Sequence, residues 1–179
     1  GLEIERLFDY SIPMSDAPRG RGTALTPANR FETSSLCAIA YEWEEAVDPA
    51  ERPAPKTRFY RDTARSLLVK NDSPAIPFTW SLNPYRGCEH GCVYCYARPY
   101  HEYLGLSSGL DFETMIFVKE DAPQLLAAEL AKPSWEAETI ALGGVTDVYQ
   151  PIERKLQVTR RCLEVLADAR HPCGLVTKN

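Results

Sequence analysis

The chain of 179 residues lacks any run of about 18 consecutive apolar residues, which a helix needs in order to cross a membrane. Its first residues, GLEIERLFDY, have neither the basic start nor the apolar centre of an export signal. We therefore expect no membrane partner and a cytoplasmic location. In that reducing compartment the six cysteines are expected to stay free thiols rather than to form disulfides.

The chain also lacks an excess of positive charge, because 20 lysines and arginines stand against 25 aspartates and glutamates. This balance argues against a protein that coats nucleic acid through its overall charge. Residues 52–70 have the opposite sign, with six basic residues, one aspartate, and Phe59 and Tyr60 between them. Such a segment is able to hold phosphates and stack a base. It follows an acidic run at residues 42–51, so mutual neutralisation is the favoured interpretation.

The composition, 44% hydrophobic and 25% charged, is that of a globular protein with one sizeable core. Residues 1–75 contain seven prolines and no strong periodicity, which predicts an irregular N-terminal extension. In it, GRG at residues 20–22 is interpreted as part of a flexible basic arm rather than a phosphate loop or substrate-binding loop. Cysteines outside the motif described next are expected to be packing residues, namely Cys37, Cys162 and Cys173.

Residues 76–179 show a different pattern, in which short apolar segments alternate with helical ones. We expect strands at IPFTWSLN, MIFVK, TIALGG and CGLVTK, and helices over residues 121–132 and 153–169. Strands that alternate with helices predict an α/β fold with a parallel sheet. Ligands of such sheets bind at the carboxyl ends of the strands. Because the cysteine loop, GGVTD and TKN all follow strands, we expect them to meet at one edge.

Three cysteines, Cys88, Cys92 and Cys95, lie within NPYRGCEHGCVYCYARPY, separated by three and then two residues. Thiolates are soft ligands for iron or zinc, and short gaps let one loop place them around a common centre. A structural zinc site needs four ligands, and neither His90 nor His101 completes a second ligand pair. A cubane iron–sulfur cluster held by three cysteines leaves one iron open for another ligand. The spacing therefore favours a 4Fe–4S cluster.

This C-x3-C-x2-C spacing, with Tyr94 just before the last cysteine, resembles the motif of radical S-adenosylmethionine (SAM) enzymes. The order SLNPYRGCEHGCVYCYARPYH, MIFVK, IALGGVTDVYQPIE and LVTKN is similar to that of uncharacterised bacterial radical SAM proteins related to spore photoproduct lyase. The resemblance covers residues 76–179 and extends more weakly to GRGTALTPANRFE. It implies the N-terminal part of a TIM-like barrel, because about four of six strand–helix units are present before Asn179.

The resemblance implies an enzyme in which SAM binds the open iron of the 4Fe–4S cluster through its amino and carboxylate groups. Reductive cleavage of SAM then generates a 5'-deoxyadenosyl radical, which removes hydrogen from a substrate that the sequence does not identify. A reducing partner of the flavodoxin or ferredoxin type is also implied. Burial around the sulfurs tunes the cluster potential, so we expect a water-poor loop around Val93 and Tyr94.

The resemblance also assigns positions that bind SAM. Gly143 and Gly144 resemble the glycine-rich strand end that lies close to the methionine amino group, although a tight turn would explain them too. Val145 stands where many radical SAM enzymes have glutamate, so the amino-group role passes to the neighbouring backbone and polar side chains. Lys178 resembles the lysine that pairs with the methionine carboxylate, the alternative being an exposed lysine. The expected SAM-binding set is Tyr94, Gly143, Gly144, Thr146, Asp147 and Lys178.

A non-catalytic alternative stays open at this point. In it, the thiolates bind zinc or an iron–sulfur cluster for structure alone, and residues 52–70 contact nucleic acid or a protein partner. Spore photoproduct lyases have a hydrogen-donating cysteine near the strand end that corresponds to GGVTD. This chain has no cysteine between Cys95 and Cys162, so no catalytic side chain is assigned.

Overall fold

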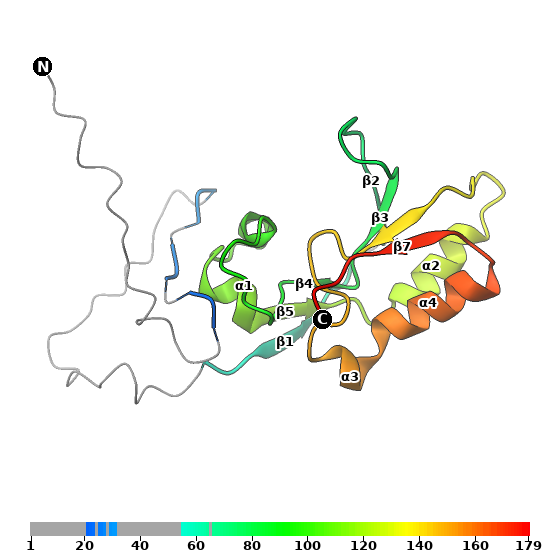
Figure 1. Ribbon diagram of the computed structural model, residues 1–179. Helices are drawn as coiled ribbons and strands as arrows, with labels where there is room; N and C mark the ends of the chain where they lie inside the picture. Colours follow the sequence, from blue (N-terminus) through cyan, green and yellow to red (C-terminus); the bar gives the residue numbers. More distant parts are fainter. Residues whose placement is uncertain (1–20, 24, 28, 32–54, 65) are drawn as a thin grey trace, which may run out of the picture.

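The computed structural model describes residues 21–23, 25–27, 29–31, 55–64 and 66–179 (Figure 1). Predictions for the other residues, including the packing of Cys37, lie outside the described part. Within that part, none of the helices combines the length and the apolar character that crossing a bilayer requires.

One sheet has the strand order β1–β5–β4. Strand β1 (Arg58–Arg61) runs parallel to β5 (Met115–Val118), and β4 (Tyr85–Arg86) runs antiparallel to β5. The predicted strand MIFVK is β5, in which Ile116 and Val118 alternate with less buried residues and face the core.

The second sheet has the order β2–β3–β6–β7. Strand β2 (Leu68–Lys70) pairs antiparallel with β3 (Trp80–Leu82), and β3 is followed by the parallel strands β6 (Ile140–Leu142) and β7 (Cys173–Leu175). The predicted strands IPFTWSLN, TIALGG and CGLVTK correspond to β3, β6 and β7. Both sheets are thus mixed, and in the described residues they form no closed barrel. The partial barrel stays a prediction.

Strands β1 and β2 lie within residues 1–75, where the sequence predicts an irregular extension. Most residues of both strands are exposed, and in β2 only Leu68 is buried. Backbone pairing with β5 and β3 places these strands, so they carry little apolar periodicity. The expected boundary at residue 75 consequently falls inside the β2–β3 hairpin.

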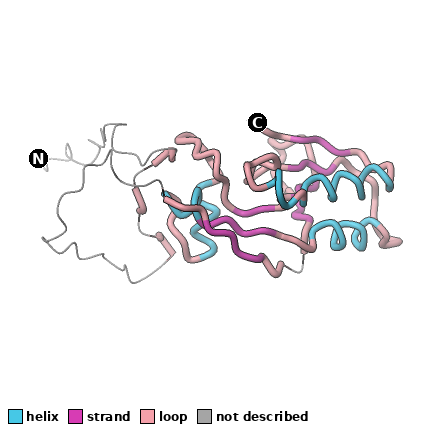
Figure 2. The backbone as a smooth tube through the Cα atoms, turned by 90° about the horizontal axis from the view of Figure 1, so that it is seen from below, coloured by secondary structure: helices cyan, strands magenta, loops and turns pink. Residues whose placement is uncertain are grey.

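Two helices, α2 (Ala122–Leu130) and α4 (Val158–Asp168), lie side by side and cover one face of the second sheet (Figures 1 and 2). Their apolar side chains meet the buried strand β6, and Leu126, Leu142 and Leu166 belong to the same core cluster. Full burial of such a side chain contributes about 1.5–3 kcal/mol to stability. This cluster is the main core of the described residues.

The helix predicted over residues 153–169 is divided in two. A short helix, α3 (Glu153–Leu156), ends at Gln157, whose φ of 50° is left-handed, and α4 begins after it. The Glu153 carboxylate accepts a hydrogen bond from the backbone N–H of Arg160 at 3.0 Å. It therefore satisfies a free donor in the first turn of α4, which stabilises the break.

Cysteines outside the motif differ from one another. Cys162, on α4, is fully buried among apolar side chains, so the prediction that it packs in the core is confirmed. Cys173 is exposed, and the same prediction is wrong for it. The reason is its place on β7, which has a neighbouring strand on one side only among the described residues.

Candidate functional site

The cysteine loop, residues 87–97, begins directly after β4. Gly87 has a φ of 81°, and a Cβ there would lie 2.8 Å from the carbonyl oxygen of Phe112, so the position requires glycine. The next residue, Cys88, donates its backbone N–H to the same oxygen at 2.9 Å. Helix α1 (Leu110–Thr114), which contains Phe112, thereby fixes the start of the loop.

All three motif cysteines are free thiols, but their surroundings differ. Cys88 is buried and packs with Phe112 in a small apolar cluster that Cys95 borders, while Cys92 is half-buried. Burial raises the pKa of the Cys88 thiol to about 11, because the thiolate loses its hydration. A metal that binds Cys88 must therefore displace a proton.

The donor chemistry of the loop fits an iron–sulfur cluster, since three thiols stand on one short segment. Among the described residues, no three Cys, His, Asp or Glu side chains converge as ligands of one ion do. A cube of four irons is wider than one ion, and each thiolate binds a different iron. The three sulfur atoms therefore need not meet at a single point. Cys88, Cys92 and Cys95 are the residues that would hold it.

The two histidines near the loop, His101 and His90, contact different oxygen atoms of the protein. His101 is buried, and its Nε2 lies 2.9 Å from the carbonyl oxygen of Met115. Burial lowers the pKa of His101, so the neutral ring donates this hydrogen bond. His90 points its Nε2 toward the carboxylate of Asp147 at 3.7 Å.

The outer part of the cysteine loop is open to solvent. Val93 is 62% exposed and Tyr94 is 75% exposed, and Tyr96 is exposed as well. The prediction of a water-poor loop around Val93 and Tyr94 is therefore wrong. These residues follow the half-buried Cys92, and no described element covers them.

The glycines after β6 have separate roles. Gly143 has a φ of 91°, and a Cβ there would lie 2.5 Å from the carbonyl oxygen of Val176, so close packing against the segment after β7 requires glycine. A Cβ at Gly144 would meet no atom within 4 Å. The Gly144 carbonyl accepts a hydrogen bond from the Tyr96 hydroxyl, which directs it toward the cysteine loop.

Thr146 and Asp147 are buried, and their polar atoms already have partners. The Thr146 hydroxyl donates to the carbonyl oxygen of Gly87 at 2.7 Å. The Asp147 carboxylate accepts from the Thr177 hydroxyl at 2.9 Å and from the backbone N–H of Lys178 at 2.7 Å. The two side chains thus join GGVTD to the cysteine loop and to TKN. Their expected part in binding SAM stays a prediction.

Lys178 brings the end of the chain to the cysteine loop. Its ammonium lies 3.2 Å from Cys92 Sγ and 2.8 Å from the Tyr94 hydroxyl, and 4.9 Å from the centre of the Tyr94 ring. The hydrogen bond with Tyr94, followed by that with Cys92, raises the pKa of Lys178. The lysine is exposed, yet its charge is placed beside one candidate cluster ligand.

Three side chains at this site were not singled out by any motif. Gln150 is fully buried and accepts a hydrogen bond from the backbone N–H of Glu89 at 3.2 Å. Arg98 donates to the carbonyl oxygen of Cys92, and Glu113 pairs with Arg98. Gln150 lies in VYQPIE, within a segment that carries the family resemblance, which is a signal that could have found it. For Arg98 and Glu113 the sequence pattern holds no such signal.

The basic segment of residues 52–70 is described from residue 55. Arg61 pairs with Asp121 at 2.8 Å, and Lys70 lies over the Trp80 ring at 5.9 Å. These contacts occupy two of its charges within the protein. Contact with nucleic acid through this segment stays a prediction.

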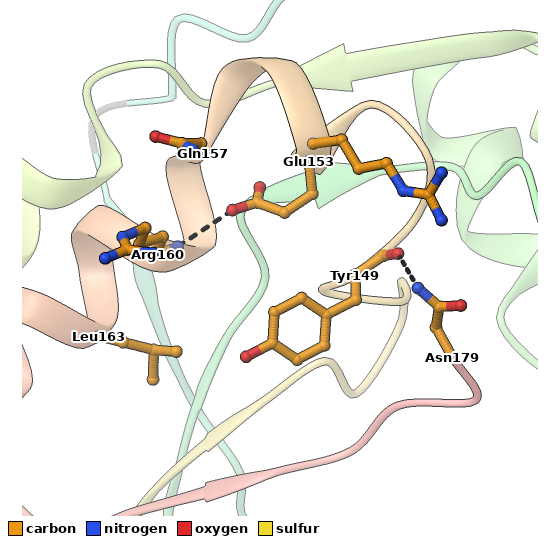
Figure 3. A pocket seen from close by; sticks show the side chains of 7 residues that line it. Tyr149, Glu153, Gln157, Arg160, Leu163 and Asn179 are labelled. Atoms are coloured by element: carbon orange, nitrogen blue, oxygen red, sulfur yellow. Dashed lines mark hydrogen bonds between the residues drawn. The ribbon is translucent and has the colours of Figure 1, made fainter.

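An open pocket of about 400 Å³ lies beside the TKN segment (Figure 3). In it, the Asn179 amide donates to the carbonyl oxygen of Tyr149 at 2.9 Å. Asn179 directly follows Lys178, but none of the candidate cluster or SAM-binding residues lines the pocket. The lining residues are Tyr149, Glu153, Arg154, Gln157, Arg160, Leu163 and Asn179.

No protein-family model matches the chain, and no solved structure does. Uncharacterised proteins of Mycobacterium tuberculosis and Mycobacterium bovis are 41% identical to it over 121 residues, which cover 67% of the chain and 36% of each relative. An uncharacterised protein of Methanocaldococcus jannaschii is 31% identical over 98 residues, 55% of the chain and 34% of the relative. The chain thus spans about a third of the length of these relatives.

Proposed function

We propose that this chain is part of a radical SAM iron–sulfur protein that cleaves SAM reductively and so generates a 5'-deoxyadenosyl radical for an organic substrate. The observation that carries the proposal is the meeting of two distant segments. Lys178, 86 residues from Cys92 along the chain, places its ammonium 3.2 Å from the sulfur of that cysteine. This contact supports the proposal because it sets a positive charge, suited to pairing with a carboxylate, beside the motif of three thiols.

The three thiolates of Cys88, Cys92 and Cys95 would hold the cluster and leave one iron to a ligand that is not a side chain of the loop. When bound, a 4Fe–4S cluster supplies the electron that splits the carbon–sulfur bond of SAM. The protein would orient the SAM molecule at the open iron. Lys178 presents a positive charge next to Cys92, where a carboxylate bound at the open iron would meet it.

Gly144 offers a second contact for the same ligand. The space around its Cα is free within 4 Å of a Cβ position, so a ligand can approach this backbone closely. Its carbonyl is engaged by the Tyr96 hydroxyl. An amino group that binds this carbonyl would displace the exposed Tyr96 hydroxyl or share the carbonyl oxygen with it.

Anaerobic reconstitution with iron and sulfide tests the proposal. We expect about four irons per chain, the paramagnetic signal of a reduced 4Fe–4S cluster, and cleavage of SAM when dithionite is added. Cys92→Ala should abolish both the cluster and the cleavage. Cys173→Ala is the matched control, because that cysteine is exposed and outside the motif.

The opposite result has an equally clear form. One zinc ion per chain, with no cleavage of SAM after reconstitution, would overturn the proposal. It would favour a non-catalytic metal-binding module in its place.

A further inference from the structure

A charged pair, Arg98 and Glu113, lies against the backbone of the cysteine loop, at the carbonyl group of Cys92, whereas Lys178 contacts the sulfur of that residue. Arg98, the first residue of a 3-10 helix (η2, Arg98–Leu104), has a side chain only 12% exposed, and that of Glu113 is 0% exposed. Their Nη2 and Oε1 atoms are 2.5 Å apart. The guanidinium also lies over the Phe112 ring, 5.4 Å from its centre.

The same guanidinium donates hydrogen bonds to the backbone of the cysteine loop. Its Nε and Nη2 donate to the carbonyl oxygen of Cys92 at 3.1 and 3.0 Å, and its Nη1 donates to the carbonyl oxygen of Gly109 at 3.1 Å. A planar group with donors in fixed directions orients what it binds. The peptide that follows Cys92 is therefore held against η2 and α1.

The second oxygen of Glu113 binds a remote segment. The backbone N–H of Gly22 donates to Oε2 at 2.9 Å, and Arg21 donates from Nη1 to the Glu113 carbonyl oxygen at 3.0 Å. Arg21 is further held by the Thr57 hydroxyl at 2.8 Å. Arg21 and Gly22 are thus bound to Glu113 of α1, which differs from the flexible arm expected for this segment.

Two glycines make this contact sterically possible. A Cβ on Gly22 would lie 1.7 Å from the carbonyl oxygen of Gly91, a distance that no side chain tolerates. Gly91 has a φ of 60°, and its own Cβ would lie 2.8 Å from Glu113 Oε2. Gly22, Gly91 and the Glu113 carboxylate are therefore packed so closely that no side-chain atom fits between them.

We propose that Arg98 and Glu113 are positioning residues that hold the cysteine loop in the form that receives the cluster. Together with Gly22 they make up a unit that we call the clamp. The inference that the clamp serves a cluster rests on the proposed function. The statement that it orders the loop does not. Arg98 acts through the backbone of Cys92, and it fixes this cysteine relative to Cys88, which is anchored separately at Phe112.

The clamp lies outside the main core. Phe112, Cys88 and Ala97 form a small cluster of their own, distinct from the cluster that contains Leu126 and Leu166. Loss of the clamp should therefore loosen the loop while the helices and the second sheet remain folded. This separation provides readouts that a purely global effect on stability would not produce.

The test compares Arg98→Lys, Arg98→Met and Glu113→Gln in the 179-residue chain. In the metal-free protein we expect the amides of residues 91–95 to exchange hydrogen, and Cys92 to react with a thiol reagent, roughly tenfold faster in Arg98→Met and Glu113→Gln. Arg98→Lys should recover part of the protection, because it keeps the charge but not the planar fork. Exposed Cys173 is the internal standard, and the circular dichroism of the helices should not change.

Arg61→Met is the matched control, since Arg61 also pairs with a carboxylate but is exposed and far along the chain from the loop. After reconstitution, the Arg98→Met chain should retain less iron and show an altered paramagnetic spectrum. Gly22→Ala should reproduce both effects through its steric clash alone.

The outcomes separate the two proposals. If the parent chain takes up no cluster, the proposed function fails, while faster exchange in the metal-free variants still supports the clamp. If exchange and thiol reactivity are the same in Arg98→Met and the parent, the clamp is overturned. If exchange is faster but iron content and spectrum are unchanged, a role toward the cluster is overturned.

Discussion

The helix-covered face of the second sheet and the cysteine loop are held together by different interactions. In the first region, apolar side chains of α2, α4 and β6 pack in a continuous cluster. In the second, Arg98 and Thr146 donate hydrogen bonds to backbone carbonyl groups of the loop, and Asp147 accepts one from the backbone N–H of Lys178. Glycines permit the close approach of these segments. The core is thus stabilised mainly by apolar burial, whereas the loop depends on individual polar atoms.

This difference bears on what each region can do. Close packing makes the core a rigid support for the ends of β6 and β7. The loop is held by a few directional bonds and has one side open to solvent at Val93, Tyr94 and Tyr96, while Cys88 is buried. Substitutions in the two regions should therefore produce different signatures, a global loss of stability in one and a local loss of order or binding in the other.

The largest effect is expected in the core. Leu142→Ala on β6 removes a fully buried side chain and leaves a cavity, and it should lower the free energy of unfolding by about 2–5 kcal/mol. Urea denaturation followed by circular dichroism measures the change. Val69→Ala, at a position 58% exposed, is the control and should change stability by less than about 0.5 kcal/mol. Equal effects of the two substitutions would contradict the assignment of the core.

A smaller effect distinguishes the two glycines after β6. Gly143→Ala combines a left-handed φ with a Cβ 2.5 Å from the Val176 carbonyl oxygen, and it should cost about 1–3 kcal/mol of unfolding free energy. Gly144→Ala meets no atom and should leave stability nearly unchanged. If Gly144 lies against SAM, the second substitution should instead weaken SAM binding in the reconstituted chain. Similar stability losses in both variants would contradict this division of roles.

Stability should also depend on pH through the core thiol of Cys162. Burial, with a smaller contribution from Glu153, raises the pKa of this thiol from its ordinary value of 9.0 to about 12. The unfolded chain ionises first, so stability is complete below pH 9 and is lost as pH rises toward 12. At pH 10 the expected loss from this group is about 1.4 kcal/mol.

Urea denaturation under reducing conditions between pH 8 and pH 10 measures this slope. Cys162→Ala removes the thiol and should reduce the slope by the share of this group, while the slope that comes from buried Cys88 remains. Cys173→Ala, at an exposed position, should leave the slope unchanged. A slope that is identical in Cys162→Ala and the parent would show that another group is responsible.

The two regions also differ in how far sequence predicts them. Strand β6 follows from a continuous apolar run, and the buried face of α4 follows from apolar residues at helical spacing. The place of Cys88, Cys92 and Cys95 on one loop follows from their closeness in the sequence. These signals are local. They stand in the sequence within one element or one loop.

Contacts between distant segments leave no such local signal. Glu113 and Arg98 resemble any surface charges until the fold brings Gly22 and Gly91 against them. The sequence predicts an irregular extension where β1 lies, because most residues of this strand are exposed and backbone pairing with β5 places it. The apolar segment around Cys173 predicts a core residue. Only the strand order shows that β7, which contains Cys173, is the last strand of its sheet among the described residues.

The smallest effect on stability is expected from Lys178, whose contribution should appear in binding alone. Lys178→Met removes an exposed ammonium beside Cys92, so the unfolding free energy should not change measurably. If the ammonium pairs with the SAM carboxylate, the dissociation constant for SAM in the reconstituted chain should rise roughly tenfold. Lys178→Arg should retain part of the affinity. Lys132→Met, which removes an exposed lysine that pairs with Glu129, is the control. Unchanged SAM affinity in Lys178→Met, with a loaded cluster, would restrict this lysine to its contacts with Tyr94 and Cys92 and remove the anion-binding group from the proposed site.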